Sequence, residues 1–320
     1  MKKYKALCIG AGSIGALKDN QFDSPESKQI YTHAHACYSH PLIDLVGVVD
    51  SDYSKAVTAA RKWNTYANKS ISDFYKYDEN KETDIVIVAT NTNTHHNIIR
   101  ELVQYKPKII ICEKPFCSNL EEAQKITNIC KVNKIQLIIN YTRTFVPELK
   151  QLSTDLLDGK YGQVYNFTLR YSRGLMREAC HAFYWCLQTF GDAYGNYSGY
   201  RFYDSPTPGD FSTYFKFKTR LCFDCAFIPI GKAYSTYNAD IYTEKGRIEL
   251  LNNWKTIRFH ENMKSTYGDY SATGLLFIDK QTQLDQALTF LLDHAIKRIE
   301  QPNYKPDLLA LDVHQQLNFK

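Results

Sequence analysis

The 320-residue chain lacks any long hydrophobic run. No stretch reaches the roughly 18 consecutive apolar residues that a transmembrane helix requires. It also lacks a long run of Lys or Arg, and 39 basic residues against 34 acidic ones leave a formal charge of only +5. A nucleic-acid-binding surface is therefore not indicated. Because the first residues, Met-Lys-Lys-Tyr-Lys, lead directly into a short predicted strand, the sequence predicts a cytoplasmic protein without a membrane span.

The sequence also lacks the residue patterns of a disulfide framework or a zinc site. Its nine cysteines are odd in number and fall mostly inside apolar runs, which is typical of reduced core thiols. Cys222-Phe-Asp-Cys225 has C-x-x-C spacing, but no second ligand pair lies nearby. His33-Ala-His35 likewise lacks a third and fourth ligand, so loop packing or a substrate contact is favoured for this pair. No metal site is predicted.

A glycine motif follows the first predicted strand, residues 4–9. Gly10-Ala-Gly12-Ser-Ile-Gly15 has glycines at the first, third and sixth positions, which allow a tight turn, close approach of the backbone to a pyrophosphate, and helix packing on a sheet. The motif is weak alone, but its place directly after a strand is the context that dinucleotide binding requires. The cofactor contacts predicted here are Gly10, Gly12, Ser13, Ile14 and Gly15.

An acidic residue, Asp50, closes the second predicted strand, residues 45–49, and Ser51 follows it. An acid there accepts hydrogen bonds from ribose hydroxyls and repels a 2′-phosphate, which favours NAD over NADP. The alternative is an ordinary aspartate at the end of a strand. Asp50 lies farther from Gly15 than the usual spacing of about 20 residues. Residues 18–33 are polar and contain a proline, and are interpreted as a loop inserted after the first helical turn.

Two further buried strands are followed by polar residues. Residues 84–89 lead into Thr90-Asn-Thr-Asn-Thr-His95 and a helix predicted over 97–103, so Thr90, Asn91, Asn93 and His95 are candidate cofactor contacts, with helix capping as the alternative role. Residues 109–111 lead into Glu113-Lys114-Pro115. A lysine at the carboxyl end of such a strand can face a cofactor and a substrate. The alternative is a surface Glu-Lys pair before a turn proline.

The pattern changes beyond residue 143. Up to there, strands alternate with helices, including a helix over 119–132 opened by a capping box at Ser118–Glu121, which predicts a doubly wound parallel sheet. Beyond it, apolar and polar residues alternate, which predicts a mainly antiparallel sheet. The expected organisation is a Rossmann domain over 1–143 and an α+β domain over 144–320. The expected elements of the second part are strands over 162–172, 212–218, 220–228 and 247–251, and helices over 147–157, 177–190 and 281–299.

The order of these motifs resembles that of the glucose-fructose oxidoreductase / inositol dehydrogenase (Gfo/Idh/MocA) family over nearly the whole chain. The segments that carry the resemblance are the glycine motif, Ala89–His95, Glu113-Lys-Pro115, Asn140-Tyr-Thr-Arg143, Tyr171-Ser-Arg-Gly174 leading to His181, and Thr243-Glu-Lys-Gly246. Members have a Rossmann domain and an open-faced α/β domain whose sheet often forms the subunit interface. They oxidise or reduce one carbinol of a sugar, cyclitol or nucleotide-linked sugar with NAD(P).

The resemblance implies roles for individual residues. Lys114, together with Glu113 before it, would lie beside the nicotinamide and the reacting hydroxyl, and His181 would be the general acid/base. The expected substrate contacts are Tyr141, Arg143, Arg177 and Glu178. Many members place an acid four residues before the histidine and another three after it, whereas this chain has Arg177 and Tyr184 there. Glu178 would replace the missing acid, or Arg177 would accept an anionic substrate.

The sequence thus predicts an NAD-dependent oxidoreductase acting on a secondary alcohol of a carbohydrate, cyclitol or sugar nucleotide, with NADP as the less favoured cofactor. The expected assembly is a homodimer or homotetramer, because the alternating strands of the second domain leave one sheet face to be covered. Two alternatives stay open. One is an NAD-binding sensor without catalysis, and the other is a reductase of a non-sugar ligand, such as a tetrapyrrole or an imine, on the same scaffold.

Overall fold

The computed structural model of the chain describes residues 3–77, 82–203, 205–206, 210–231, 235–264, 271–301 and 308–317. The chain divides into two compact units. The first comprises residues 1–145 and 285–315, and the second comprises residues 146–284 and 316–320. The division after residue 145 lies near the expected boundary at 143. The return of residues 285–315 to the first unit departs from the expectation that everything beyond 143 belongs to the second.

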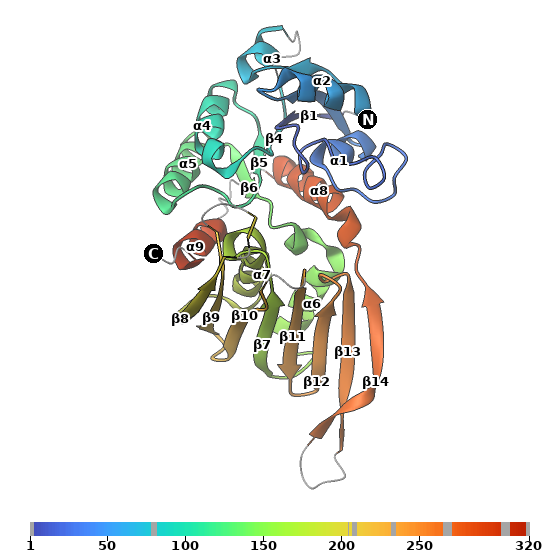
Figure 1. Ribbon diagram of the computed structural model, residues 1–320, viewed down its shortest axis with the longest axis vertical. Coiled ribbons are helices and arrows are strands. Elements are labelled where there is room, and N and C mark those ends of the chain that lie inside the picture. Colours follow the sequence, from blue (N-terminus) through green and yellow to red (C-terminus); the bar gives the residue numbers. More distant parts are fainter. Residues whose placement is uncertain are drawn as a thin grey trace. The chain divides into compact units, whose positions relative to one another are not determined.

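The first unit contains a six-stranded sheet in the order β3-β2-β1-β4-β5-β6 (Figure 1). Every neighbouring pair in it is parallel. β4, β5 and β6 are buried along their whole length, which explains why they read as short apolar runs. The predicted doubly wound parallel sheet is therefore confirmed. Its strands are β1 (Tyr4–Ile9), β2 (Ile43–Val49), β3 (Ala67–Asn68), β4 (Ile85–Val88), β5 (Ile109–Cys112) and β6 (Gln136–Ile139).

The helices of the first unit include one from the far end of the sequence. They are α1 (His33–Ser39), α2 (Tyr53–Lys62), α3 (Ile71–Tyr77), α4 (Thr92–Leu102), η1 (Val103–Tyr105), α5 (Leu120–Val132), η2 (Thr142–Phe145), α8 (Ala287–Glu300) and most of α9 (Leu308–Leu317). α8 buries Leu288, Leu291 and Leu292 in the same core cluster as Ala6 of β1 and Ile87 of β4. This shared core places α8 with the first unit.

Two predicted helix starts are displaced in the structure. α4 begins at Thr92, five residues before the predicted start, because Asn91 occupies the N-cap position in an extended conformation. The cap of α5 lies one residue later than predicted. The Asn119 side chain, not that of Ser118, accepts from the Glu122 backbone N at 2.9 Å, and Glu122 Oε2 accepts from the Ser118 backbone N at 3.3 Å.

The second unit contains an eight-stranded sheet in the order β14-β13-β12-β11-β7-β10-β9-β8 (Figure 1). Its pairs are antiparallel except for β7 with β10, so the expected mainly antiparallel sheet is confirmed. The elements are α6 (Pro147–Leu157), β7 (Val164–Tyr171), the π-helical turn η3 (Leu175–Ala179), α7 (Cys180–Phe190), β8 (Ala193–Phe202), β9 (Ser212–Thr219), β10 (Asp224–Pro229), β11 (Tyr237–Thr243), β12 (Gly246–Leu251), β13 (Thr256–Lys264), β14 (Ser271–Gln281) and, at the junction of the two units, η4 (Leu284–Gln286).

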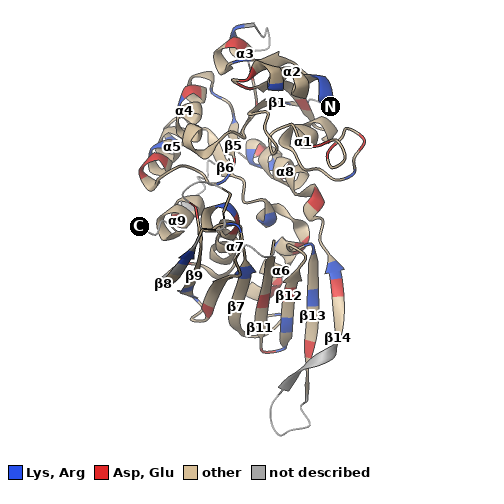
Figure 2. Ribbon diagram, in the orientation of Figure 1, with Lys and Arg blue, Asp and Glu red and all other residues tan. Residues whose placement is uncertain are grey.

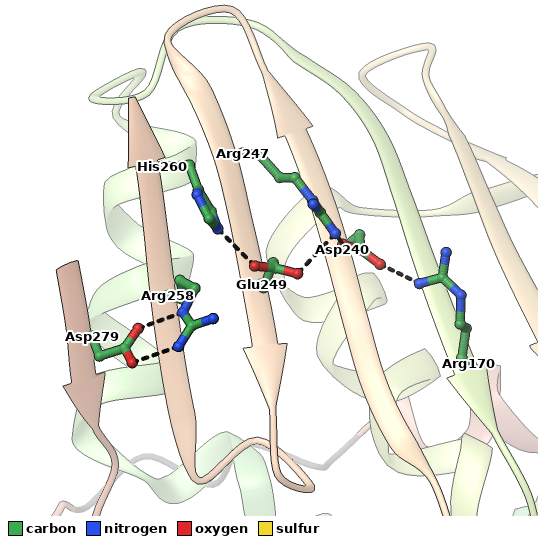
Figure 3. A network of polar contacts seen from close by, with 7 residues as sticks. All are labelled: Arg170, Asp240, Arg247, Glu249, Arg258, His260 and Asp279. Atoms are coloured by element: carbon green, nitrogen blue, oxygen red, sulfur yellow. Dashed lines mark hydrogen bonds and ion pairs between the residues drawn. The ribbon is translucent and has the colours of Figure 1, made fainter. Parts of the chain in front are cut away.

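The two faces of this sheet differ in chemistry. On one face Phe183 of α7 packs edge-on against Phe215 and Phe217 of β9, with ring centroids 5.7 and 5.0 Å apart. The other face carries the ion-pair network of Figure 3, in which Asp240 lies between Arg170 and Arg247. Figure 2 shows charges of both signs along β12, β13 and β14. This second face is called the open face below.

Three further observations concern membrane spans, metal ligands and cysteines. Within the described ranges, no helix is long and apolar enough to cross a membrane. Among the same residues, no group of three or more His, Cys, Asp or Glu side chains could hold a metal ion. All nine cysteines are free, as the sequence predicted. Cys222 lies exposed in a turn with φ +63°, so β10 begins at Asp224 rather than at the predicted residue 220.

Candidate functional site

The residues predicted to bind a cofactor follow the carboxyl ends of the parallel strands. Gly10 follows β1, Asp50 follows β2, Thr90 follows β4 and Glu113 follows β5. Because all strands run in one direction, these ends lie along one edge of the sheet. The strand order reverses between β1 and β4, and ligands of open α/β sheets bind at such a reversal. This edge is the candidate cofactor site.

The three glycines of the loop after β1 have different structural roles. Gly10 has φ +100°, and a Cβ on it would lie 2.5 Å from the Ala89 carbonyl O. A Cβ on Gly15 would lie 1.8 Å from the Gly10 carbonyl O. Gly12 is exposed, and a Cβ on it would meet nothing within 4 Å. The fold itself therefore requires Gly10 and Gly15, whereas Gly12 leaves an open cradle of backbone that fits a pyrophosphate group.

Replacing Gly12 with alanine separates ligand binding from folding. We expect Gly12→Ala to keep the wild-type melting temperature, because its methyl group meets no protein atom, but to weaken NAD binding roughly tenfold or more by filling the cradle. Gly15→Ala is the matched control and should lower the melting temperature. Thermal unfolding and NAD titration measure the two effects. Unchanged NAD affinity in the Gly12 variant would contradict this assignment of the cradle.

Asp50 is fastened to the glycine loop by its side chain. Its Oδ2 accepts from the Ala11 backbone N at 2.7 Å, and its Oδ1 accepts from the Asp52 backbone N at 2.9 Å. Each carboxylate oxygen keeps a second lone pair for another donor. The half-buried side chain is thus held at the sheet edge, next to exposed Ser51, with accepting capacity left.

The long spacing between the glycine motif and Asp50 comes from an insertion within a helix. The backbone N of His33 donates to the Ile14 carbonyl O at 3.0 Å, and that of Ala34 donates to the Gly15 carbonyl O at 2.9 Å. In an uninterrupted α-helix the Ile14 carbonyl O would accept from the backbone N four residues later, which is that of Lys18. Here His33 takes the place of Lys18. Fifteen residues are therefore inserted, and without them Asp50 would follow Gly15 by 20 residues, the spacing typical of dinucleotide-binding units.

The polar segment after β4 divides between exposed and buried residues. Asn91 and Asn93 are exposed at the start of α4, and Thr90 is half-buried. His95 is fully buried, and its two ring nitrogens face the Phe116 carbonyl O at 2.9 Å and the Thr90 carbonyl O at 3.1 Å. Thr90, Asn91 and Asn93 therefore lie where a ligand can reach them, whereas His95 connects the loops after β4 and β5.

Glu113 is only 6% exposed, and both of its carboxylate oxygens have partners. Its Oε1 lies 2.8 Å from His33 Nε2 and 2.6 Å from Asn140 Nδ2, and its Oε2 accepts from the Lys114 backbone N at 3.2 Å. Burial acts to raise the pKa of Glu113, but the His33 hydrogen bond and charge, with Lys114 and Asn140, hold that pKa below its ordinary value. The carboxylate form is thus favoured inside the first unit.

His33 and His35 were predicted to serve loop packing or a substrate contact. Both form buried pairs, His33 with Glu113 and His35 with Asp23, with 2.7 Å between His35 Nδ1 and Asp23 Oδ1. These pairs agree with the packing role, but the partner of His33 was not predicted. Tyr141, a predicted substrate contact, is only 1% exposed, while Arg143 is half-buried.

The predicted residues of the second unit lie around the start of α7. His181 lies in its first turn and is 4% exposed. Arg177 and Glu178 lie in η3, with Arg177 Nε 3.6 Å from Glu178 Oε1. Glu178 and His181 were expected to share one face of an α-helix, as residues i and i+3. Since η3 is a π-helical turn, that α-helical spacing does not apply across it. Asp210 was not among the predicted residues. Its carboxylate accepts from the backbone N of Met176 and of Arg177, both at 3.0 Å.

Comparison with known proteins agrees with a dinucleotide-binding fold in the first unit. Residues 4–141 match the model of the Gfo/Idh/MocA family, which is described as an oxidoreductase family with an NAD-binding Rossmann fold. The resemblance that the sequence motifs suggested is thus confirmed over residues 4–141.

Curated relatives match the chain over part of their length. The rhizopine catabolism protein MocA of Rhizobium meliloti is 30% identical over 167 residues, 52% of this chain and 46% of the relative. The NADP(+) scyllo-inositol 2-dehydrogenase IolU of Bacillus subtilis is 31% identical over 127 residues, 40% of this chain and 37% of the relative. The matches thus span less than half the length of these relatives.

A solved structure matches the chain over nearly all its residues. An oxidoreductase from Agrobacterium radiobacter, solved with NAD+, L-tartaric acid and magnesium, has a TM-score of 0.74 at 12% identity and covers 99% of this chain and 94% of its own. At this identity the likeness concerns the fold alone. It extends to both sheets, so the two-part architecture is that of known oxidoreductase structures.

Proposed function

We propose that the chain is an NAD-dependent oxidoreductase that transfers a hydride to or from a secondary alcohol of a sugar, cyclitol or sugar nucleotide. The observation that carries the proposal is Lys114, which follows β5 at the same sheet edge as the open glycine cradle and is attached by its backbone N to the buried carboxylate of Glu113. A passive nucleotide-binding protein needs the cradle but does not need a lysine held there. The inositol dehydrogenase among the relatives supports the cyclitol class.

The residues at the sheet edge fit a nicotinamide dinucleotide. The backbone from Gly10 to Gly15 would hold the pyrophosphate, Asp50 would accept from the ribose hydroxyls, and exposed Asn91 would supply an amide group. When bound, the nicotinamide supplies or accepts the hydride. The protein contributes binding, orientation and a place for the proton.

We assign the proton chemistry to two residues. His181 would take or give the hydroxyl proton as general base or acid, because an imidazole titrates near neutral pH. Lys114 would stabilise the negative charge that develops on the substrate oxygen. Arg143 and Arg177 would contact the substrate, and Tyr141 and Glu178 are the remaining predicted substrate contacts.

An activity screen tests the proposal against both alternatives. The protein is incubated with NAD or NADP and with myo-inositol, scyllo-inositol, free sugars or nucleotide sugars, and the reduced nicotinamide is followed by its absorbance. Thermal shift on the same mixtures reports binding, because a ligand of the native state raises the melting temperature. NAD binding without turnover of any carbinol would favour the sensor. A parallel assay with NADH or NADPH and an imine follows the loss of the same absorbance, and turnover there alone would favour the reductase of a non-sugar ligand.

Asp50 leads to a prediction about cofactor preference. We expect NAD to bind at least roughly tenfold more tightly than NADP, because the carboxylate would lie against the 2′-phosphate and Ser51 supplies no compensating cation. Fluorescence titration of the two reduced cofactors measures the ratio. Asp50→Ser should bring the two affinities closer. Equal affinities in the wild type would contradict the role of Asp50.

The open face leads to a prediction about assembly. We expect a homodimer or homotetramer in which a second copy covers this face, because α7 packs on the other one. Ile228 of β10 pairs with Arg170 of β7 and so lies on the open face, where Ile228→Arg should shift the protein toward monomer in light scattering. Leu157→Arg, at the exposed end of α6, is the matched control. A wild-type monomer at micromolar concentration would contradict the prediction.

A further inference from the structure

The five-residue loop after β5, Glu113 to Cys117, is called the lysine loop because it carries Lys114. It is held by three buried histidines that come from three separate parts of the first unit. His33 begins α1, His95 lies on α4 and His314 lies on α9. They are respectively 1%, 0% and 3% exposed, so none of the three contacts depends on a mobile surface side chain.

The first contact acts through the carboxylate before the lysine. His33 Nε2 lies 2.8 Å from Glu113 Oε1, and Glu113 Oε2 accepts from the Lys114 backbone N. Asn140, which follows β6, donates to the same Oε1 at 2.6 Å. The carboxylate therefore has partners on both oxygens, and His33 and Asn140 together fix the plane in which it meets the Lys114 backbone.

The second and third contacts hold the loop behind the lysine. His95 Nδ1 lies 2.9 Å from the Phe116 carbonyl O, and its Nε2 lies 3.1 Å from the Thr90 carbonyl O. The backbone N of Cys117 donates to His314 Nε2 at 3.1 Å, and the His314 ring lies edge-on to Phe116 with centroids 6.2 Å apart. The backbone is thus bound at Lys114, Phe116 and Cys117, on both sides of the lysine side chain.

We propose that His33, His95 and His314 are positioning residues for Lys114, and that they fix the backbone from which the lysine reaches the reacting hydroxyl. The inference rests on the proposed function for its catalytic consequence. A lysine side chain has four rotatable carbon bonds, so a fixed backbone below it narrows the positions that its ammonium group can take. A displacement of about 1 Å at a reacting group can lower a rate roughly 100-fold.

The test uses His33, because its ring is hydrogen-bonded to the lysine loop through the Glu113 carboxylate. His33→Leu removes the donor to Glu113, and His33→Gln replaces it with an amide whose nitrogen lies near the position of Nε2. His40→Leu is the matched control, since His40 is equally buried in the same unit but pairs with Asp293, 3.2 Å away, and not with the lysine loop. Amide hydrogen exchange of the peptides that cover Lys114 to Cys117 is measured for all variants.

We expect His33→Leu to speed exchange in the lysine loop by roughly tenfold or more relative to wild type, while β4 and β1 stay protected. His33→Gln should restore slow exchange, and His40→Leu should leave the loop unchanged. With a substrate from the activity screen, His33→Leu should lower kcat roughly 100-fold at nearly constant KM and NAD affinity, with recovery in His33→Gln.

The outcomes separate this inference from the proposed function. Wild-type exchange in His33→Leu overturns the positioning role, whether or not an activity has been found. Faster exchange with an unchanged kcat also overturns it, because the loop would then be held for stability alone. Faster exchange in His33→Leu, together with a wild type that turns over no carbinol, would support the structural role of the three histidines. It would contradict the proposed oxidoreductase function instead.

Discussion

Replacing His181 by alanine is expected to lower kcat about 100- to 10,000-fold while leaving NAD affinity largely unchanged. This range is what a general acid/base typically contributes, and the residue lies in α7, outside the glycine loop that would bind the cofactor. Lys114→Ala should likewise lower kcat, because the developing charge on the substrate oxygen would lose its cation. Steady-state kinetics and NAD titration on each variant separate loss of turnover from loss of binding.

Arg177→Ala provides the internal control for this pair. If Arg177 only recognises an anionic substrate such as a nucleotide sugar, its loss should mainly raise KM, whereas loss of His181 should mainly lower kcat. Wild-type turnover in His181→Ala would refute the role inferred from the family resemblance. Glu178 would then be the next candidate, followed by Asp210, which caps the helical segment that leads to His181.

The sequence predicted the sheets of both units because their signals are local. β4 and β5 are runs of four buried residues, and each was recognised within two residues of its observed ends. The alternating residues of β7 likewise reflect one buried and one solvated face. Such patterns depend only on neighbours in the chain. They indicate which element forms, and the glycine motif indicates which edge of the sheet binds a ligand.

The anchoring of the site could not be predicted, because its contacts join residues far apart in sequence. His33 and Glu113 are 80 positions apart, and Cys117 and His314 are 197 apart. No periodicity relates such pairs. The same reason explains why α8 was assigned to the second domain. Its apolar face predicts burial, but only the folded chain shows that Leu288 and Leu291 share a core with β1 and β4.

The helix errors have a more local cause. Thr92 and Asn93 are weak helix formers, so the sequence favoured a loop where α4 in fact begins. Ser118 and Asn119 both have side chains that can cap a helix, and a shift of one residue exchanges their roles. These errors move element ends by one to five residues. His95 consequently lies on α4 itself, where it is fully buried, and its cofactor contact stays a prediction.

The stability of the first unit is expected to fall steeply as the pH is lowered from 6.5 to 4. Burial lowers the pKa of His314 from its ordinary 6.5 to about 4, although nearby Glu122 partly opposes this. Between these values the unfolded chain binds a proton that the folded chain excludes, so the free energy of unfolding decreases with falling pH. This pKa shift corresponds to a contribution of about 3 kcal/mol to the free energy of unfolding. The contribution is present in full above pH 6.5 and is lost by pH 4.

His314→Gln isolates this contribution, because a glutamine oxygen can accept from the Cys117 backbone N without titrating. Urea unfolding at pH 7, 6, 5 and 4 gives the free energy of unfolding of both proteins. The wild type should lose about 3 kcal/mol more than the variant across this range, since carboxylates such as Glu113 and Asp23, whose pKa values are lowered in the fold, contribute equally to both. Parallel pH profiles would contradict the prediction, because they would mean that His314 is protonated in the folded chain as readily as in the unfolded one.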